Sequence, residues 1–333
     1  MEQASAHGGK QRAMVQGFTQ AVRAIKKAQR IIISGHINPD GDCLGSLLGL
    51  GLGLKKLGKR VIMLRQGDTP RMYRRLPGAG LLKETTSLRA DLAIAVDCSM
   101  PQMLGDAAYG VFHKAGRILE IDHHEFRTSF ADISLIHTNA AAVGEIVYQL
   151  LVRLGVKLDK PVAENILTSI IVETNSFRLP AVRPLTFNIC AALLKTGVDF
   201  YRLSEMVYWS KTPQAALLSG VCMSRAVFLR KGRLVWSRVT LADFKRNRGL
   251  DEDVDAVADE MRSIKGVRIA VLFREKNRRI LRVSLRSKKG INVVRVAQHF
   301  GGGGHGDVAG CFLENSPQAI QRLLSLTGRL IPG

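Results

Sequence analysis

Residues 31–46 read IIISGHINPDGDCLGS: an apolar run, a polar loop with proline and glycines, and the start of a second apolar run. The three isoleucines are typical of a short buried strand. A helix is predicted before them, over 12–28, because apolar residues recur there at helical spacing. A Gly- and Leu-rich helix is predicted after the loop, near 43–57. A strand between two helices is the typical opening of an α/β domain.

The same alternation continues along the chain. Further strands are predicted at 60–64, 92–96 and 117–121, and further helices near 142–154, 161–171 and 186–196. Strands that alternate with helices imply a mostly parallel sheet flanked by helices. We expect this first domain to span residues 1–197.

A change of pattern predicts a second, smaller domain. A helical connector is expected at 198–220, and residues 221–333 are expected to form an α/β domain with a mixed sheet. Within it, the segments 226–239 and 268–285 are predicted hairpins. The predicted fold class is therefore α/β with two domains, and a catalytic cleft is expected between them.

The chain is strongly basic, with a formal net charge of +21 over 333 residues and a pI near 10.3. Such a field attracts anionic ligands, of which nucleic acids and nucleotides are the obvious examples. A host with a basic proteome would produce the same overall charge. The placement of the charge favours an anion-facing surface, because ten Lys and Arg residues lie between Lys265 and Lys289 against one acid, Glu275.

The sequence also predicts where the protein works. No apolar stretch reaches the roughly 18 residues that a membrane helix needs, and the first residues lack the order of a secretory signal. The five cysteines are scattered, with no Cys-x-x-Cys pair. We therefore expect a cytoplasmic protein with reduced thiols and no membrane partner.

Potential metal ligands follow three of the predicted strands. They are His36, Asp40 and Asp42 in the first loop, Asp97 after the strand at 92–96, and Asp122, His123 and His124 after the strand at 117–121. Sheets of this class bind ligands at the carboxyl ends of their strands. Carboxylates mixed with imidazoles suit manganese, iron or magnesium rather than a structural zinc. The alternative for the first loop is a turn in which an Asp caps the next helix.

Taken in order, these motifs resemble the DHH phosphoesterase superfamily, which is named for the triplet at 122–124. The stretch 284–287, Ser-Leu-Arg-Ser, followed by 301–305, Gly-Gly-Gly-Gly-His, resembles the DHH-associated C-terminal domain. The two-domain size is most similar to the nanoRNase type, bifunctional oligoribonucleases that are also 3'-phosphoadenosine-5'-phosphate (PAP) phosphatases. This resemblance implies hydrolysis of short RNA to mononucleotides and of PAP to AMP.

The resemblance also implies a set of metal ligands. Two divalent ions are expected, with Mn²⁺ favoured and Mg²⁺ or Co²⁺ as alternatives. One ion is assigned to His36, Asp40 and Asp97, and the second to Asp42, Asp97, His123 and Glu173. Two ions about 3.5–4 Å apart can hold a bridging hydroxide for in-line attack on phosphate.

Catalytic roles follow from the same resemblance. Asp97 is expected to bridge the two ions, and His124 to contact the scissile phosphate. Asp122 is expected to orient a metal-bound imidazole. Glu173 departs from the family's pattern, because many members have Asp-Thr-Gly where this chain has Glu173-Thr174-Asn175. The longer side chain would coordinate with a shifted geometry.

Substrate binding is assigned to the second domain. The residues that the resemblance implies are Arg286, Ser287, Gly303, Gly304 and His305. Backbone amides of the glycine run can approach an anion closely. The alternative for the glycines is a helix C-cap, although four in succession exceed what a cap needs. Asp307 and Val308 stand where the family commonly has small residues, which would alter substrate preference.

Other functions stay open at this point. A single-strand-specific exonuclease shares both domains but usually adds an oligonucleotide-binding module, and an aromatic content of 6% argues against a long base-stacking track. A family II inorganic pyrophosphatase shares the metal motifs without the glycine-histidine motif. A catalytically impaired nucleotide-binding protein would have lost ligands, yet every expected ligand position holds a competent residue. The sequence leaves cleavage polarity and oligomeric state open, a homodimer included.

Overall fold

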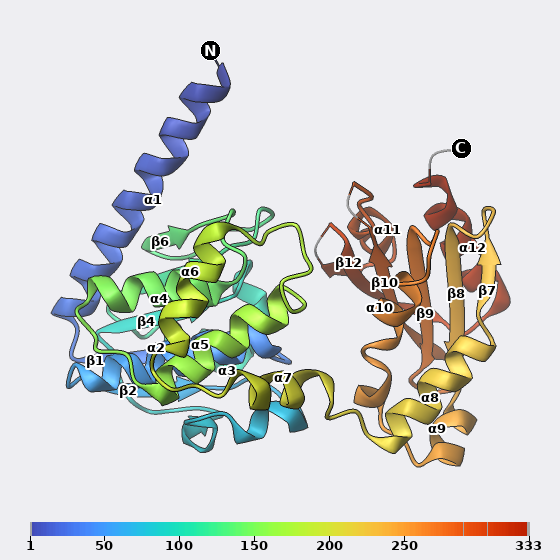
Figure 1. Cartoon of the computed structure of the whole chain (residues 1–333), viewed down its shortest axis with the longest axis horizontal. Coiled ribbons are helices and arrows are strands. Elements are labelled where there is room, and N and C mark those ends of the chain that lie inside the picture. Colours follow the sequence, from blue (N-terminus) through green and yellow to red (C-terminus); the bar gives the residue numbers. More distant parts are fainter. Residues whose placement is uncertain (1, 289, 305, 332–333) are drawn as a thin grey trace. The chain divides into compact units, whose positions relative to one another are not determined.

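The three isoleucines of the opening stretch lie in β1 (Arg30–Ser34), in which every residue after the first is buried. The structure is a computed structural model that describes residues 2–288, 290–304 and 306–331, with side chains from Val15 onward. Five more strands complete the sheet around β1: β2 (Arg60–Leu64), β3 (Leu82–Lys83), β4 (Leu92–Val96), β5 (Ile118–Asp122) and β6 (Ile133–Ile136). Their order is β3-β2-β1-β4-β5-β6 (Figure 1).

Each described pairing in this sheet is parallel, with Ile31 opposite Val61 on one side and Leu92 on the other. The prediction of a mostly parallel sheet is confirmed. The short edge strands β3 and β6 were not predicted, since two to four residues are too few to show a period. Parallel strands align their carboxyl ends, so the loops after β1, β4 and β5 start at one edge.

Apolar side chains cover both faces of the sheet. Ile31 and Ile33 point into a large core with the helices α1 (Glu2–Lys27), α2 (Gly41–Lys56), α4 (Val143–Arg153) and α5 (Lys160–Glu173). Ile32 points the other way, into a smaller core with α3 (Gly105–Phe112). Successive residues of a strand face opposite sides, and burial on both sides explains the unbroken apolar run.

Glycines set the spacing between α2 and α5. A Cβ atom on Gly45 would lie 2.5 Å from the carbonyl oxygen of Asn165 and 2.8 Å from the backbone nitrogen of Ser169. One turn later, a Cβ atom on Gly49 would lie 2.8 Å from Cγ1 of Ile166. Backbone atoms cannot move aside as a flexible side chain can, so the two helices pack this closely only because Gly45 has no side chain.

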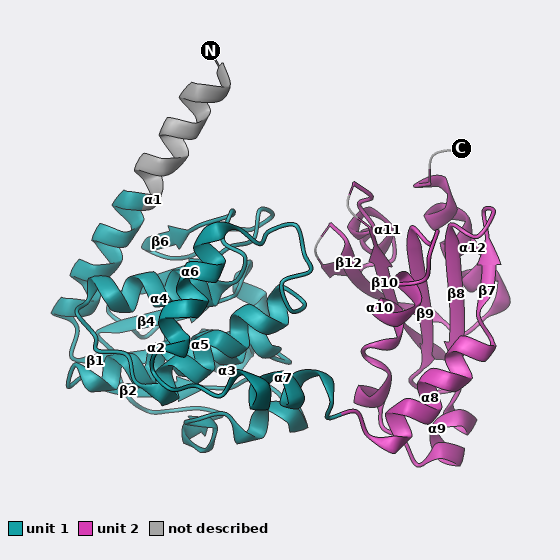
Figure 2. Cartoon of the chain, viewed as in Figure 1, with its two compact units in different colours: residues 1–210 teal, residues 211–333 magenta. Residues whose placement is uncertain are grey.

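The chain divides into two units, residues 1–210 and 211–333 (Figure 2). The helices α6 (Pro184–Leu194) and α7 (Phe200–Tyr208) belong to the first unit, and Leu203 of α7 lies in its core. The helix α8 (Pro213–Ser224) belongs to the second, where Leu218 and Cys222 are buried. The expected connector at 198–220 is therefore shared between the two units.

The second unit contains a mixed six-stranded sheet. Its strands are β7 (Val227–Leu229), β8 (Leu234–Val239), β9 (Ile269–Glu275), β10 (Ile280–Ser287), β11 (Gly303–Gly304) and β12 (Val308–Glu314). The order is β11-β12-β10-β9-β8-β7, and the β8–β9 pair is parallel while the other described pairs are antiparallel. Both predicted hairpins are confirmed, as β7–β8 and β9–β10.

Helices pack on this second sheet as well: α8, α10 (Val257–Arg262), α11 (Val294–His299) and α12 (Pro317–Arg329), while α9 (Leu241–Asn247) packs against α8. The two-domain α/β prediction is confirmed. Within the described ranges of the chain, we find no helix with the length and apolar character to cross a membrane.

Candidate metal centre

The loop after β1 presents His36 to the carboxyl edge of the sheet. Backbone hydrogen bonds from Ile37 to Met103 and from Asn38 to Gln66 anchor the loop to its neighbours. The Nδ1 nitrogen of His36 lies 2.9 Å from the carbonyl oxygen of Ile37 and donates to it. The Nε2 nitrogen is then left to face the acidic residues of the site.

Asp40 and Asp42 have different environments although they are two residues apart. Asp40 caps α2, because its Oδ1 accepts hydrogen bonds from the N–H groups of Asp42 and Cys43, both 3.0 Å away. The helix cap that the sequence offered as the alternative role for this loop is therefore present. Asp40 also faces His36, whose Nε2 is 3.9 Å from the same oxygen. The Asp40 side chain is about half exposed, at 54%.

Asp42 is fully buried and held by three donors. Its Oδ1 accepts from the hydroxyls of Ser46 (3.1 Å) and Ser169 (2.5 Å), and its Oδ2 from the backbone N–H of Val143 (3.0 Å). Oδ2 also lies 3.7 Å from Nε2 of His123. Burial and the nearby Asp97 carboxylate raise the pKa of Asp42 to about 7. A cation at Oδ2 would offset that penalty.

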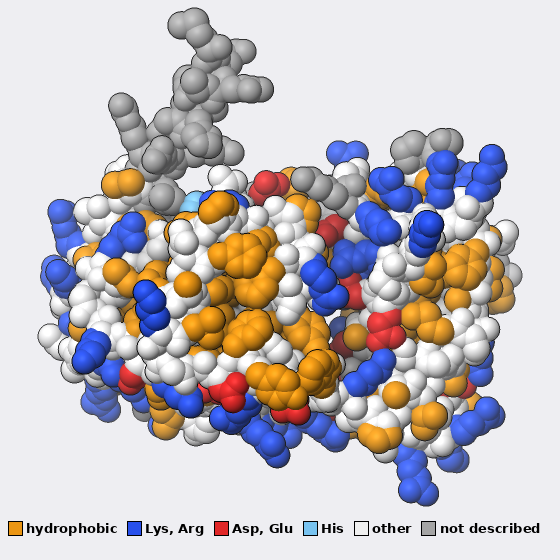
Figure 3. Space-filling model, in the orientation of Figure 1, with side chains coloured by type: hydrophobic (Ala, Val, Ile, Leu, Met, Phe, Trp, Pro, Cys, Tyr) orange, Lys and Arg blue, Asp and Glu red, His pale blue; other side chains and the backbone are white. Residues whose placement is uncertain are grey.

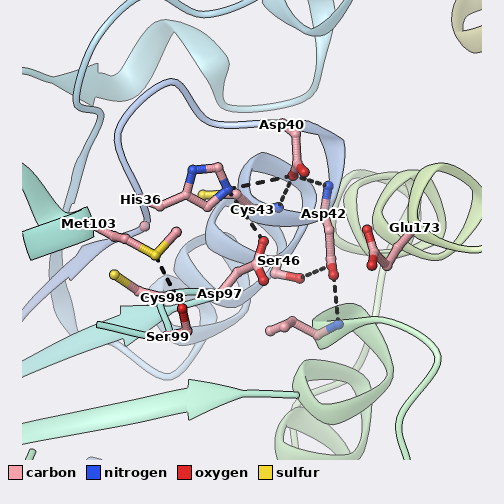
Figure 4. Close-up of polar contacts among 12 residues, drawn as sticks. His36, Asp40, Asp42, Cys43, Ser46, Asp97, Cys98, Ser99, Met103 and Glu173 are labelled. Atoms are coloured by element: carbon pink, nitrogen blue, oxygen red, sulfur yellow. Dashed lines mark hydrogen bonds and ion pairs between the residues drawn. The ribbon is translucent and has the colours of Figure 1, made fainter. Parts of the chain in front are cut away.

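Asp97 lies directly after β4 in the centre of the cluster (Figure 4). Its Oδ2 is 3.6 Å from Nε2 of His36, and its Oδ1 is 4.0 Å from Nε2 of His123 and 3.7 Å from Nδ1 of His124. The residue is buried, and the imidazole nitrogens that face its carboxylate lie beyond ordinary hydrogen-bond distance. Its backbone is left-handed, with φ at 53°. Such strain at a non-glycine residue is concentrated at functional sites.

His123 is oriented like His36. Its Nδ1 donates to the carbonyl oxygen of Ala140, 3.1 Å away, so that Nε2 faces Asp42 and also Glu173, whose Oε1 is 3.7 Å distant. Glu173 is the last residue of α5. Three left-handed residues follow it, Asn175, Ser176 and Phe177, and they turn the chain sharply away from the helix.

Asp122 contacts His124 rather than His123 through its side chain. The Nδ1 nitrogen of His124 donates to Oδ1 of Asp122 at 2.6 Å, and the backbone N–H of His123 donates to the same oxygen at 2.8 Å. Burial opposes ionisation of Asp122, but the hydrogen bond from His124 is among the contacts that lower its pKa. Asp122 therefore orients the second histidine of the triplet.

Three groups of donor atoms could each hold an ion, with their atoms within 4.8 Å of one another: His36, Cys43 and Asp97; Asp97, His123 and His124; and Asp42, His123 and Glu173. Their geometry fits a metal, because the Nε2 nitrogens of His36 and His123 face carboxylate oxygens of Asp97 and Asp42. Acceptors that face acceptors at 3.6–4.0 Å repel unless a cation or a proton lies between them. Asp40 lies outside the three groups.

Sequence reasoning missed Cys43 as a member of this cluster. It treated the five cysteines only as scattered reduced thiols, and all five are free and buried. The available signal was position, because Cys43 follows Asp42 in the first turn of α2. Burial raises the pKa of the Cys43 thiol, so the metal-free protein holds it in the neutral form.

The expected substrate residues of the second unit have defined partners. Arg286 donates from Nε to Oδ2 of Asp259 at 2.9 Å and from Nη1 to its neighbour Leu285. The hydroxyl of Ser287 is buried and donates to the carbonyl oxygen of Ile291 at 2.6 Å. His305 lies outside the described residues.

The glycine run has a packing role. Gly303 and Gly304 form β11, which pairs with β12, and a Cβ atom on Gly304 would lie 2.3 Å from the carbonyl oxygen of Val308. At Gly302 it would lie 2.1 Å from the carbonyl oxygen of Gly310. Close approach of two backbones therefore requires glycine here, independently of any ligand.

Much of the basic segment at 265–289 is neutralised within the protein. Arg274 is 2% exposed and pairs with Asp255 at 2.6 Å, while Arg282 pairs with Asp251 at 2.9 Å. Lys276 also lies within 3.4 Å of Asp251. On the face shown in Figure 3, Lys and Arg side chains occur on both units. The positive charge is therefore less concentrated on this segment than the sequence suggested.

Carboxylates and imidazoles that gather around Asp97 at the carboxyl edge of a parallel sheet are the arrangement expected of a metal-dependent enzyme of the α/β class. Family models agree, since residues 30–172 match the DHH family, N-terminal domain, and residues 242–331 match the DHHA1 domain. The chain belongs to the DHH family of metal-dependent phosphoesterases.

Similar proteins that carry a functional name support this family membership. The chain is 30% identical over 298 residues to the bifunctional oligoribonuclease and PAP phosphatase NrnA of Thermus thermophilus, covering 88% of each chain. It is 25% identical over 324 residues to the protein of the same name in Bacillus subtilis, covering 92% of this chain and 97% of that one.

Solved structures show the same fold. An exopolyphosphatase-related protein from Bacteroides fragilis superimposes with a TM-score of 0.87 at 23% identity, covering 94% of this chain and 96% of that one. RecJ from Thermus thermophilus, in complex with Mn²⁺, gives a TM-score of 0.53 at 14% identity, and the match covers 55% of RecJ.

Proposed function

We propose that this protein hydrolyses short oligoribonucleotides to mononucleotides and PAP to AMP at the site around Asp97. The observation that carries the proposal is the buried Asp97 carboxylate, which faces three imidazole nitrogens at 3.6–4.0 Å, a spacing with room for ions between them. Relatives that match nearly the whole chain are named for these two activities. A cytoplasmic location accords with five free cysteines, and a homodimer remains part of the hypothesis.

The proposed cofactor is a pair of divalent ions, Mn²⁺ first, with Mg²⁺ or Co²⁺ as alternatives. His36, Asp40 and Asp97 would hold one ion, and Asp42, Asp97, His123 and Glu173 the other. When bound, such a pair supplies Lewis-acid activation of water and neutralises phosphate charge. Support comes from the hydrogen bonds that fix the imidazoles, since carbonyl acceptors at Nδ1 turn the Nε2 nitrogens of His36 and His123 toward the acids.

The protein's own residues position the phosphate and the protons. Asp122 fixes the ring of His124 through Nδ1, so His124 can present its other nitrogen to a scissile phosphate and stabilise the charge that develops there. Its pKa is raised, because Asp122 and Asp97 outweigh the effect of burial. A cationic His124 suits contact with an anionic substrate.

In the second unit we assign Arg286 to a substrate phosphate or sugar. Its Nη2 has no acceptor among the described residues, which leaves one edge of the guanidinium for a ligand. Ser287 would act indirectly, through the hydrogen bond from its hydroxyl to the carbonyl oxygen of Ile291. Gly303, Gly304 and His305 complete the proposed substrate-binding set.

The test is a substrate panel with purified protein and Mn²⁺: a dinucleotide, a pentanucleotide, PAP, pyrophosphate and a long single strand. We expect turnover of the two short RNAs and of PAP, and slow turnover of the long strand. Preference for the long strand would favour the exonuclease alternative, and turnover of pyrophosphate alone would indicate a pyrophosphatase. Metal binding without turnover of any substrate would leave the impaired nucleotide-binding protein.

A further inference from the structure

The Cys43 thiol lies inside the candidate metal centre, and the proposed function does not use it. Cys43 is in the first turn of α2 and is fully buried. Its sulfur, a nitrogen of His36 and an oxygen of Asp97 all lie within 4.8 Å of one another. Figure 4 shows the sulfur beside the His36 ring.

The neighbouring backbone holds the thiol in this place. A Cβ atom on Gly35 would lie 2.1 Å from Sγ of Cys43 and 3.2 Å from the carbonyl oxygen of Val96. Any residue other than glycine at 35 would therefore displace the sulfur, so the loop that presents His36 also fixes Cys43.

A second observation indicates that a ligand belongs beside this sulfur. Asp97 is 4% exposed, and its carboxylate faces three imidazole nitrogens at 3.6–4.0 Å rather than at close hydrogen-bond distance. Its Oδ2 points at Nε2 of His36 over 3.6 Å, a separation too long for a good hydrogen bond and suited to two donors around one ion. The sulfur completes a set of imidazole, carboxylate and thiol donors.

We propose that Cys43 is a ligand of the ion held by His36 and Asp97, and that it makes this position selective for thiophilic ions such as Zn²⁺, Co²⁺ and Cd²⁺. The inference rests on the metal site of the proposed function but not on its substrate. Coordination replaces the S–H bond with a sulfur–metal bond, and the proton passes to solvent. Thiolate favours softer ions than the carboxylates and imidazoles of the second position do.

The competing explanation is packing alone. A buried cysteine often behaves as a small apolar residue. Cys98 is such a case in the same neighbourhood, because it follows Asp97, is buried, and directs its thiol to the carbonyl oxygen of Met100 at 3.3 Å. It belongs to none of the three donor groups, which makes it a matched control.

Cobalt spectroscopy tests the proposal without any substrate. Co²⁺ is titrated into the metal-free full-length protein and into Cys43→Ser, Cys43→Ala and Cys98→Ser. We expect the near-ultraviolet band of thiolate-to-cobalt charge transfer in the wild type and in Cys98→Ser, and its loss in both Cys43 variants. Competition with a chelator should show a loss of about 10- to 100-fold in Zn²⁺ affinity for Cys43→Ser, with a much smaller change for Mn²⁺.

The wild-type spectrum decides the matter even when a variant fails to fold. Bound Co²⁺ that shows visible ligand-field absorption but no charge-transfer band would overturn the proposal, as would a band that survives in Cys43→Ser. Absence of nuclease activity in a protein that keeps the cysteine-dependent band would refute the proposed function and leave this inference standing.

Discussion

The Nδ1 nitrogen of His124 lies 2.6 Å from Oδ1 of Asp122, and this contact sets the direction of the second imidazole of the triplet. Backbone N–H groups of His123 and His124 also donate to Oδ1 of Asp122 and fix the carboxylate, while its buried Oδ2 has no partner in the described ranges. A residue that orients another group in this way should affect rate more than substrate affinity.

Asp122→Asn should lower kcat by about 10- to 100-fold with little change in KM, because the amide keeps the shape but loses the charge that holds the His124 proton. Steady-state kinetics with a dinucleotide measure this effect. Glu120→Gln is the control, since Glu120 is buried on the same strand but pairs with Arg127 at 2.7 Å, outside the donor groups. Equal losses in both variants would show that any charge removed from β5 impairs the fold.

Removal of the central carboxylate should separate stability from function. Asp97→Asn should be inactive but still folded, because the amide keeps the shape of the carboxylate and Asn tolerates the left-handed backbone. Turnover of a dinucleotide measures the activity, and thermal unfolding with and without Mn²⁺ measures the stability. Chelation should abolish wild-type activity, and Mn²⁺ should restore it better than Ca²⁺. Turnover that persists in Asp97→Asn or Asp97→Ala would refute the two-ion proposal.

Glu173→Asp tests the ligand that departs from the family's pattern. The carboxylate would withdraw by one methylene from His123, now 3.7 Å away, so we expect a change of about tenfold in Mn²⁺ affinity or in kcat. Isothermal titration with Mn²⁺ and kinetics at saturating metal distinguish the two. Glu164→Asp makes the same change in α5 away from the donor groups and should have no such effect. If both variants resemble the wild type, Glu173 is not a ligand.

Arg286→Ala should raise KM for short oligonucleotides and PAP by about 10- to 100-fold, since a charge-assisted hydrogen bond contributes roughly 1.5–3 kcal/mol. Hydrolysis of bis-p-nitrophenyl phosphate, which is too small to need this contact, should stay nearly intact. Asp259 keeps Arg262 as a partner at 2.7 Å, so no buried charge is left alone.

Arg282→Ala is the control for Arg286, because Arg282 faces the same side of β10 and pairs with Asp251. It should leave KM unchanged. A loss of equal size on both kinds of substrate in Arg286→Ala would mean that Arg286 supports the fold.

Acid should weaken the second unit through Asp243. Burial opposes its ionisation, but hydrogen bonds from Arg225 and Thr240 lower its pKa to about 2 from an ordinary value of 3.8. The unfolded chain binds the proton first, so the stabilisation is present above about pH 4 and is lost as the pH falls toward 2. Asp243→Asn should cost about 1–3 kcal/mol at pH 7 and much less at pH 2, as measured by urea unfolding. A constant difference between these pH values would exclude the ionic contribution.

The sequence predicted which side chains of the first unit gather at one place, because parallel strands bring their carboxyl ends together, so Asp97 and His123 could be placed near His36 without coordinates. Asp40 shows the limit of this reasoning. One carboxylate can cap a helix and face a metal site, and spacing alone does not separate the two roles. Cys43 was missed because its sulfur reaches the cluster only by packing closely against Gly35, and such a contact cannot be read from the sequence.

The second unit was harder to predict at the level of side chains. Its hairpins follow from local alternation, but the pairing of Arg286 with Asp259 depends on how α10 packs on β10. Opposite charges far apart in sequence give no local signal. For this reason the sequence suggested more unpaired positive charge on the basic segment than the structure has.

Gly45 ties the chemistry of the site to the distance between two helices. Asp42 is on α2 and Glu173 is on α5. The two helices are also linked by the hydroxyl of Ser169 on α5, which donates to Asp42 at 2.5 Å. Both carboxylates are proposed for the same ion, so their separation is set by a contact that admits no side chain at 45. Displacements of about 1 Å are enough to disturb a catalytic geometry. A single methyl group placed at position 45 would therefore change the distance between the two proposed ligands without altering either ligand.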